Sequence, residues 1–205
     1  MNNKVWPLVL AVLFMLSGCS HRHKSMMQRL NQPYEDNPTM QERVRKLMGI
    51  TMELPADMQA SKQGKDFLWI SNNAATGMKN VVIYKVKTSE SLPLSVERFC
   101  SLRDSVMQIN LKGASDSMFV TTLKASVEGR FNAKEKLCRY AGLWEMHGDA
   151  MGGQFVSNVY QHPNGQGLII AEGFLYAPET NNKQTLLSQL KTILGSINIK
   201  NNNGK

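Results

Sequence analysis

The sequence predicts an α+β domain in which a twisted antiparallel β-sheet is flanked by two or three helices, as in an αβα sandwich. Segments with strand signals follow one another through short loops, which is typical of antiparallel neighbours. Two later segments carry an apolar stripe at helical spacing, and such stripes are buried against a sheet. The chain has 205 residues, of which 42% are hydrophobic. This length suits one domain with a real core and a processed leader.

The first predicted helix covers residues 40–48. Thr39 and Glu42 fit a capping box at its start, and Val44 begins an apolar stripe at helical spacing. Gly49 follows as a natural stop because glycine accepts the left-handed conformation of a helix C-cap.

The second helix opens within residues 91–95, and Asn182 can cap the third. Each has one apolar face, which we expect to lie in the core. In the second helix this face holds Val96, Phe99, Cys100, Val106 and Met107; in the third it holds Leu186, Leu187, Leu190, Ile193, Leu194 and Ile197.

Strands are expected where β-branched and aromatic residues lie between turn signals. Pro55 ends the first strand and Pro178 ends the last, while residues 162–165 form a turn between the final two. The predicted strands are 50–54, 67–70, 81–86, 118–123, 126–131, 137–146, 155–160 and 168–176.

Residues 1–18 have the pattern of a lipoprotein signal peptide. Lys4 supplies a positive n-region, and the apolar run 5–16 is too short for a membrane span, which needs about 20 residues. The segment ends in Leu-Ser-Gly-Cys at residues 16–19, which resembles the bacterial lipobox. The resemblance implies transfer of a diacylglyceryl group to the Cys19 sulfur, cleavage after Gly18 and acylation of the new amino terminus, typically with palmitate.

A lipid anchor on Cys19 would attach the protein to a membrane and so predicts its location in the cell. Two or more acyl chains hold a protein stably on a membrane. Residues 19–38 then form a lipidated cysteine and a flexible tether of roughly 25 Å, residues 39–198 a single domain, and residues 199–205 a polar tail. Basic rather than acidic residues follow Ser20. We therefore expect a bacterial cell-envelope protein, with the outer membrane favoured and the domain facing the periplasm.

The charge of the chain does not indicate a nucleic-acid binder. The formal net charge is +8, and removal of Lys4 with the leader leaves +7. In sequence, the basic residues of the body are spread out rather than clustered. Those close to the anchor suit an anionic membrane surface.

Four segments resemble a known family: residues 66–70 (DFLWI), 143–146 (LWEM), 151–155 (MGGQF) and 172–178 (EGFLYAP). Over about residues 50–197 the chain is similar to an uncharacterised lipoprotein family of Bacteroidota, the domain of unknown function 4837. The family pattern has Arg-Gly before Leu-Trp-Glu and Pro before the Phe of Met-Gly-Gly, where this chain has Ala141 and Gln154. The order of elements is similar to the PsbP-like αβα sandwich. Neither resemblance implies an activity or a functional residue.

The stretch 143–155 concentrates two carboxylates, a histidine and three glycines. We interpret it as a structural turn between two strands, because Gly-Asp and Gly-Gly permit positive φ. Loops also carry function, so a ligand or partner contact here is the alternative. The residues of that contact would be Trp144, Glu145, His147, Asp149, Met151, Gly152 and Gly153.

Two further hypotheses use the same stretch. An envelope hydrolase would use His147 with Glu145 or Asp149, although no serine or cysteine nucleophile is adjacent. A small metal-binding protein would use Met146, His147 and Met151. No cofactor is expected, because phosphate-loop, zinc and Rossmann signatures are absent from the sequence.

Two cysteines remain besides Cys19. Cys100 and Cys138 each fall on an apolar face of their element. They form either a disulfide, which the oxidising periplasm permits, or two buried thiols that act as small hydrophobes. The resulting prediction is an envelope lipoprotein with an accessory domain that binds a ligand or an envelope protein.

Overall fold

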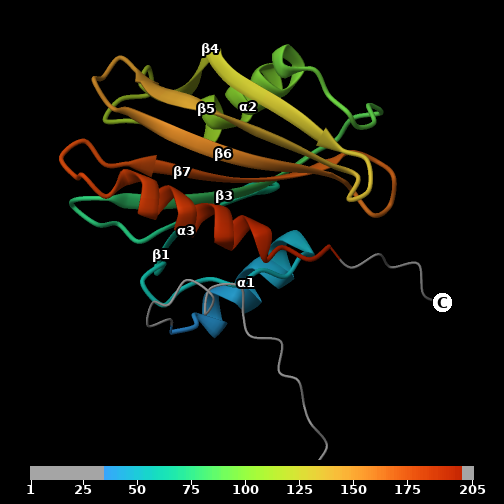
Figure 1. Cartoon of the computed structure of the whole chain (residues 1–205), viewed down its shortest axis with the longest axis horizontal. Helices are drawn as coiled ribbons and strands as arrows, with labels where there is room; N and C mark the ends of the chain where they lie inside the picture. Colours follow the sequence, from blue (N-terminus) through green and yellow to red (C-terminus); the bar gives the residue numbers. More distant parts are fainter. Residues whose placement is uncertain (1–34, 200–205) are drawn as a thin grey trace, which may run out of the picture.

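The computed structural model describes residues 35–199, and Figure 1 shows a sheet with helices on both faces. The sheet has seven strands in the order β1-β2-β3-β7-β6-β5-β4, all antiparallel to their neighbours. The predicted α+β fold is therefore confirmed. The predicted signal peptide, Cys19 and the tether up to residue 34 lie outside the described residues.

Residues 35–199 form three helices and the seven strands of a single sheet. They are α1 (Pro38–Met48), β1 (Ala60–Gly64), β2 (Phe67–Ser71), β3 (Met78–Val86), α2 (Val96–Asn110), β4 (Phe119–Asn132), β5 (Leu137–His147), β6 (Gly152–Gln161), β7 (Leu168–Tyr176) and α3 (Lys183–Gly195).

Helix α1 begins two residues earlier than predicted. Its N-cap is Asn37, whose Oδ1 accepts a hydrogen bond of 3.1 Å from the backbone N–H of Met40. The capping box at Thr39 was wrong, because Pro38 occupies the first helical position, where its missing N–H costs nothing. Gly49 ends the helix with φ at 72°, as predicted.

The predicted strand at 50–54 was also wrong. Its backbone makes isolated bridges, from Thr51 to Asn198 and from Pro55 to Asp36. Ile50, Met52 and Leu54 are nevertheless buried. The alternation of apolar residues therefore indicated burial, although the segment does not pair with the sheet. The sequence missed β1, a polar edge strand whose residues, ASKQG, give little strand signal.

One long edge strand replaces the two strands predicted at 118–123 and 126–131. The register of β4 against β5 shifts between Leu123 and Glu128. Such bulges are common on edge strands, where they discourage pairing with another chain.

The helices cover the two faces of the sheet unequally. Helix α2 packs on β4 from one face, whereas α3 packs on β7, β6 and β3 from the other, with α1 beside β2 and β3 (Figure 1). Two core clusters result, one between α1, α3 and the sheet and one between α2 and the sheet. On the α3 side, the outer part of β4 and β5 lies beyond α3. This uncovered half-face positions the candidate site.

None of the helices in residues 35–199 combines the length and apolar character that crossing a bilayer requires.

Candidate functional site

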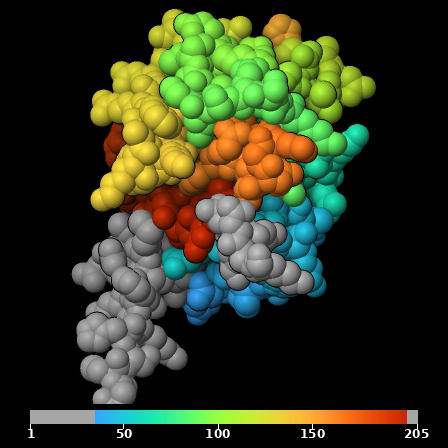
Figure 2. Space-filling view, turned by 90° about the vertical axis from the view of Figure 1, so that its right-hand side faces the viewer, coloured from blue at the N-terminus to red at the C-terminus, as the bar shows by residue number. Residues whose placement is uncertain are grey.

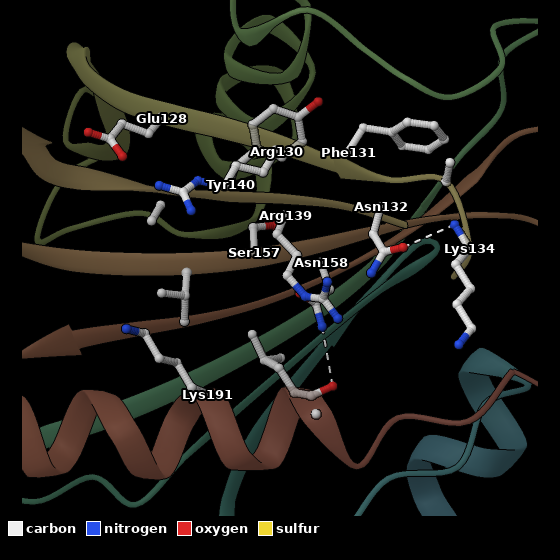
Figure 3. Close-up of a pocket in the computed structure, with 15 residues that line it drawn as sticks. Glu128, Arg130, Phe131, Asn132, Lys134, Arg139, Tyr140, Ser157, Asn158 and Lys191 are labelled. Atoms are coloured by element: carbon white, nitrogen blue, oxygen red, sulfur yellow. Dashed lines mark hydrogen bonds between the residues drawn. The ribbon is translucent and has the colours of Figure 1, made fainter. Parts of the chain in front are cut away.

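An open groove lies between the carboxyl-terminal part of α3 and strands β4 and β5. Its volume is about 980 Å³, within the range of small-molecule sites. In Figure 3, Arg139, Asn158 and Lys191 extend into the space between the strands and α3. We call this space the basic groove.

Strand alternation explains why these side chains face α3. Successive side chains of a strand point to opposite faces, and the buried Cys138 and Tyr140 belong to the core on the α2 side. Arg139 between them therefore points to the other face. Arg130 of β4 and Asn158 of β6 lie directly opposite Arg139 in the register and share its face.

Two arginines thus stand side by side with unequal compensation. Arg139 forms an ion pair with Glu135 across the β4–β5 turn. Arg130 and Lys191 have no ion pair or hydrogen bond with any residue in the described part of the chain. Like charges directly opposite each other in a sheet are destabilising by roughly 0.2–1 kcal/mol. The fold therefore places two cations without a partner in residues 35–199, Arg130 and Lys191, beside the paired Arg139 at the wall of the groove.

The basic groove corrects an expectation from the sequence. No basic cluster was expected in the body of the chain. The structure brings four cations and one carboxylate to the lining of the groove: Arg130, Lys134, Arg139 and Lys191 with Glu128. Because Glu135 pairs with Arg139, the formal charge at the groove is +2. Three of the cations lie within residues 130–139, so part of the cluster was visible in the sequence. Lys191 joins them from a helix that starts more than 40 residues later.

The floor of the groove is tied to α3 by a hydrogen bond and is partly apolar. Asn158 Nδ2 donates to the carbonyl oxygen of Leu194 at 3.3 Å and to Tyr160 Oη at 3.1 Å, which ties the end of α3 to β6. Ala141 and Val156 lie side by side in the next cross-strand row. The small side chain of Ala141 leaves room above the sheet.

A second hollow lies at the other end of the same strands, beside the β5–β6 turn. Its volume is about 340 Å³, and its lining includes Leu123, Leu143, Glu145 and Asp149. We call it the turn hollow. It contains several of the residues that the sequence singled out.

The stretch 143–155 is a β-hairpin in the structure. Strand β5 ends at His147 and β6 begins at Gly152, with Gly148 at φ 83° in the turn. The backbone N–H of Met146 donates to the carbonyl oxygen of Met151 at 2.8 Å. The Asp149 carboxylate accepts from the backbone N–H of Ala150 at 2.6 Å. Gly148 thus serves the turn, whereas Gly152 and Gly153 belong to β6 and lack the positive φ that the sequence suggested. A ligand or partner contact here stays a prediction.

Trp144 and Gly153 are held in the interior. Trp144 Nε1 donates to the carbonyl oxygen of Leu175 at 3.1 Å. A Cβ added to Gly153 would lie 1.9 Å from that same oxygen. Close approach of the β7 backbone therefore requires glycine here.

The hydrolase hypothesis gains no support from the hairpin. Glu145, His147 and Asp149 are exposed. His147 stacks on Phe119 with ring centroids 5.0 Å apart. Within residues 35–199, no hydrogen bond or ion pair joins His147 to either carboxylate.

The structure does not bring together the three residues of the metal hypothesis. Met146 and Met151 pack against the core on the α2 side, whereas His147, next to Met146 in the strand, points to the other face. Among the described residues there is no group of three or more His, Cys, Asp or Glu side chains placed to hold a metal ion.

Cys100 and Cys138 are both buried and both free thiols in the structure. Burial raises the pKa of the Cys100 thiol. Of the two alternatives left open by the sequence, the structure has two buried thiols that pack as small hydrophobes.

A buried polar cluster on the α2 side escaped the sequence analysis. Arg103 of α2 donates two hydrogen bonds of 2.8 Å to the Glu172 carboxylate and one of 2.8 Å to Thr122 Oγ1. Both charged side chains are fully buried, and the guanidinium lies 4.4 Å from the centre of the Phe155 ring. The one available signal was a glutamate inside the apolar run of β7, LIIAEGFLY.

Burial and pairing act in opposite directions on the two charges of this cluster. Burial raises the pKa of Glu172, and the Arg103 guanidinium opposes that rise. For Arg103, burial lowers the pKa, but the Glu172 carboxylate together with Tyr84 and Asp104 outweighs burial, and the pKa is raised. The Tyr84 and Ser157 hydroxyls are buried, without a hydrogen-bond partner in the described part of the chain. The pair is enclosed, so the cluster is a structural feature of the core.

Comparison with known proteins identifies a family but no activity. A family model described as a domain of unknown function (DUF4837) matches residues 37–196, which covers all three helices and all seven strands. A search of curated proteins gives no match.

Proposed function

The chain belongs to the DUF4837 family, whose description assigns no activity, and we propose a function from its own residues. The protein is a lipid-anchored protein of the bacterial cell envelope, and its domain binds an anionic ligand in the basic groove.

The cross-strand pair of Arg130 and Arg139 carries the proposal for binding. An anion between the two guanidinium groups would replace a repulsion with charge-assisted hydrogen bonds. Arginine suits this role because its planar fork matches carboxylate and phosphate oxygens. Lys191 from α3 would add a third cation from across the groove.

The leader supports the anchor. The n-region, the short apolar run and the residues Leu16 to Cys19 have the lipoprotein pattern. An anchored protein with a tether and a ligand groove fits an accessory role near the membrane. The outer membrane, with the domain facing the periplasm, is the location that we propose.

Titration with pyrophosphate tests the binding. We expect saturable binding by calorimetry, and a loss of at least tenfold in affinity for Arg130→Gln and for Arg139→Gln. Arg43→Gln is the matched control, because Arg43 is exposed on α1 and its loss changes the net charge equally. Equal weakening in all three variants would indicate a general charge effect and count against the groove.

Mass spectrometry of the protein from membranes tests the anchor. We expect a chain that begins at Cys19 and carries acyl groups. A chain that retains residues 1–18, or an unmodified Cys19, would rule the anchor out while leaving the groove untouched.

A further inference from the structure

The basic groove and the turn hollow lie on one continuous strip of the sheet. Arg139, Ala141 and Leu143 alternate along β5 and therefore share a face. Arg130 lies opposite Arg139, and Leu123 lies opposite Leu143. We call this the β4–β5 strip.

The two ends of the strip differ in polarity. Leu123 is 42% exposed and Leu143 is 39% exposed, and neither belongs to either core cluster. Of the four large hydrophobic side chains exposed in residues 35–199, two lie opposite each other on this strip: Leu123 and Leu143. Such a pair is notable on a surface where exposed apolar residues normally lie singly.

The two ends of the strip also differ in charge. Arg130, Arg139 and Lys191 gather at the end near α3, whereas Glu145 and Asp149 lie at the turn hollow. An anionic group is attracted to the first end and repelled from the second. The four-residue step from Arg139 to Leu143 corresponds to roughly 13 Å at the rise of a strand.

We propose that the occupant of the β4–β5 strip is a single-chain anionic lipid, with its headgroup between Arg130, Arg139 and Lys191 and its alkyl chain extended over Ala141 to Leu123 and Leu143. This inference rests on the proposed anionic ligand and adds the apolar part of that ligand. Glu128 lies opposite Ala141, so the middle of the strip disfavours a second anionic group and accepts an uncharged chain.

The ligand that we propose is one lipid molecule held by the domain, and not the surface of a bilayer. The groove is hollowed and bounded by α3, as Figure 3 shows, which suits a single headgroup. Figure 2 shows a space-filling view of the molecule in which α3, coloured red, lies in a recess beneath the hairpin strands coloured yellow and orange.

Chain length tests the proposal. Dodecyl phosphate, butyl phosphate and inorganic phosphate are titrated into the purified chain below the micelle concentration. We expect dodecyl phosphate to bind at least tenfold more tightly than butyl phosphate. Leu143→Ser should weaken the affinity for dodecyl phosphate at least fivefold and leave the affinity for butyl phosphate unchanged. Arg130→Gln should weaken both affinities.

Matched variants separate the outcomes. Ile109→Ser removes an exposed apolar side chain at 74% exposure on α2 and should leave every affinity unchanged. Leu123→Ser repeats the apolar test on the neighbouring strand, and circular dichroism checks that each variant is folded.

Three results would overturn the inference. Equal affinity for the two alkyl phosphates, both lost in Arg130→Gln, would retain the anionic ligand and exclude the lipid. Binding of intact phosphatidylglycerol vesicles without binding of monomeric dodecyl phosphate would indicate a membrane surface instead of one lipid. Failure of every probe to respond to Arg130→Gln would remove both the lipid and the proposed function.

Discussion

Arg103 and Arg130 lie on opposite sides of the same half of the sheet, and their surroundings are opposite. Arg103 is enclosed between α2 and the sheet, where Glu172 meets it with two hydrogen bonds of 2.8 Å. Arg130 faces the uncovered strip, where its opposite neighbour is another arginine.

The charge of Arg103 is neutralised inside the protein, whereas the charge of Arg130 has no partner in residues 35–199. A buried charge without a partner would cost several kcal/mol, so the interior supplies a carboxylate and a hydroxyl to Arg103. Water screens an exposed arginine, so Arg130 can persist beside Arg139 at a small cost. The second arrangement is the one to which we assign the proposed anion.

The largest expected effect comes from breaking the enclosed pair. Glu172→Gln removes the buried carboxylate that pairs with Arg103 and leaves only the partly exposed Asp104, 3.7 Å from the guanidinium. We expect a loss of about 3–5 kcal/mol in the free energy of unfolding, measured by urea denaturation. The double variant Arg103→Met, Glu172→Leu should recover most of the loss, because it removes both charges.

The matched control for this variant is an exposed pair. Arg45 holds Glu42 by hydrogen bonds of 2.6 Å and lowers the pKa of that carboxyl to about 2. Both side chains are about half exposed, so Glu42→Gln should have a much smaller effect than Glu172→Gln. Similar losses in the two variants would contradict the role of burial.

A gain in stability, intermediate in size, is expected from a substitution beside the Arg103–Glu172 pair. The Tyr84 hydroxyl is buried without a hydrogen-bond partner among the described residues. Removing it in Tyr84→Phe should stabilise the domain by about 1 kcal/mol, because an unsatisfied buried hydroxyl is costly. Destabilisation in the same urea experiment would show that the hydroxyl has a partner, such as a buried water.

The smallest effect is expected on the uncovered strip. Arg130→Gln removes a like-charge repulsion, and we expect a gain of roughly 0.2–1 kcal/mol in the free energy of unfolding without ligand. Repeating the measurement at high salt should reduce the gain because salt screens exposed charges. A loss of stability would show that Arg130 is compensated within the protein, and the comparison with Arg103 would fail.

The sequence predicted the fold class and most elements, and its errors have common causes. The predicted strand at 50–54 showed apolar alternation, which indicates burial, but pairing with the sheet depends on partners elsewhere in the chain. Strand β1 was missed because its polar residues lie at an exposed edge, where hydrogen bonding to β2 makes the strand. The helix start at Pro38 was misplaced by two residues, within the usual uncertainty of helix ends.

The hairpin at 143–155 shows what local sequence resolves. Its glycines predicted a turn, which is present at Gly148, whereas the close backbone approach at Gly153 emerged from the structure. These are short-range features that depend on backbone conformation and the absence of a Cβ. The catalytic and metal hypotheses drew on the same residues, but adjacent strand residues point to opposite faces.

The sequence by itself determined a lipoprotein-type leader as a prediction, an α+β domain and the family to which residues 37–196 belong. Only the tertiary structure decided which charges meet. Cross-strand register placed Arg130 beside Arg139, the packing of α3 on β7, β6 and β3 left the β4–β5 strip uncovered, and the packing of α2 on the sheet joined Arg103 to Glu172. Periodicity along a chain specifies which face a side chain occupies, but the neighbours across strands and helices are fixed only when the distant elements pack together.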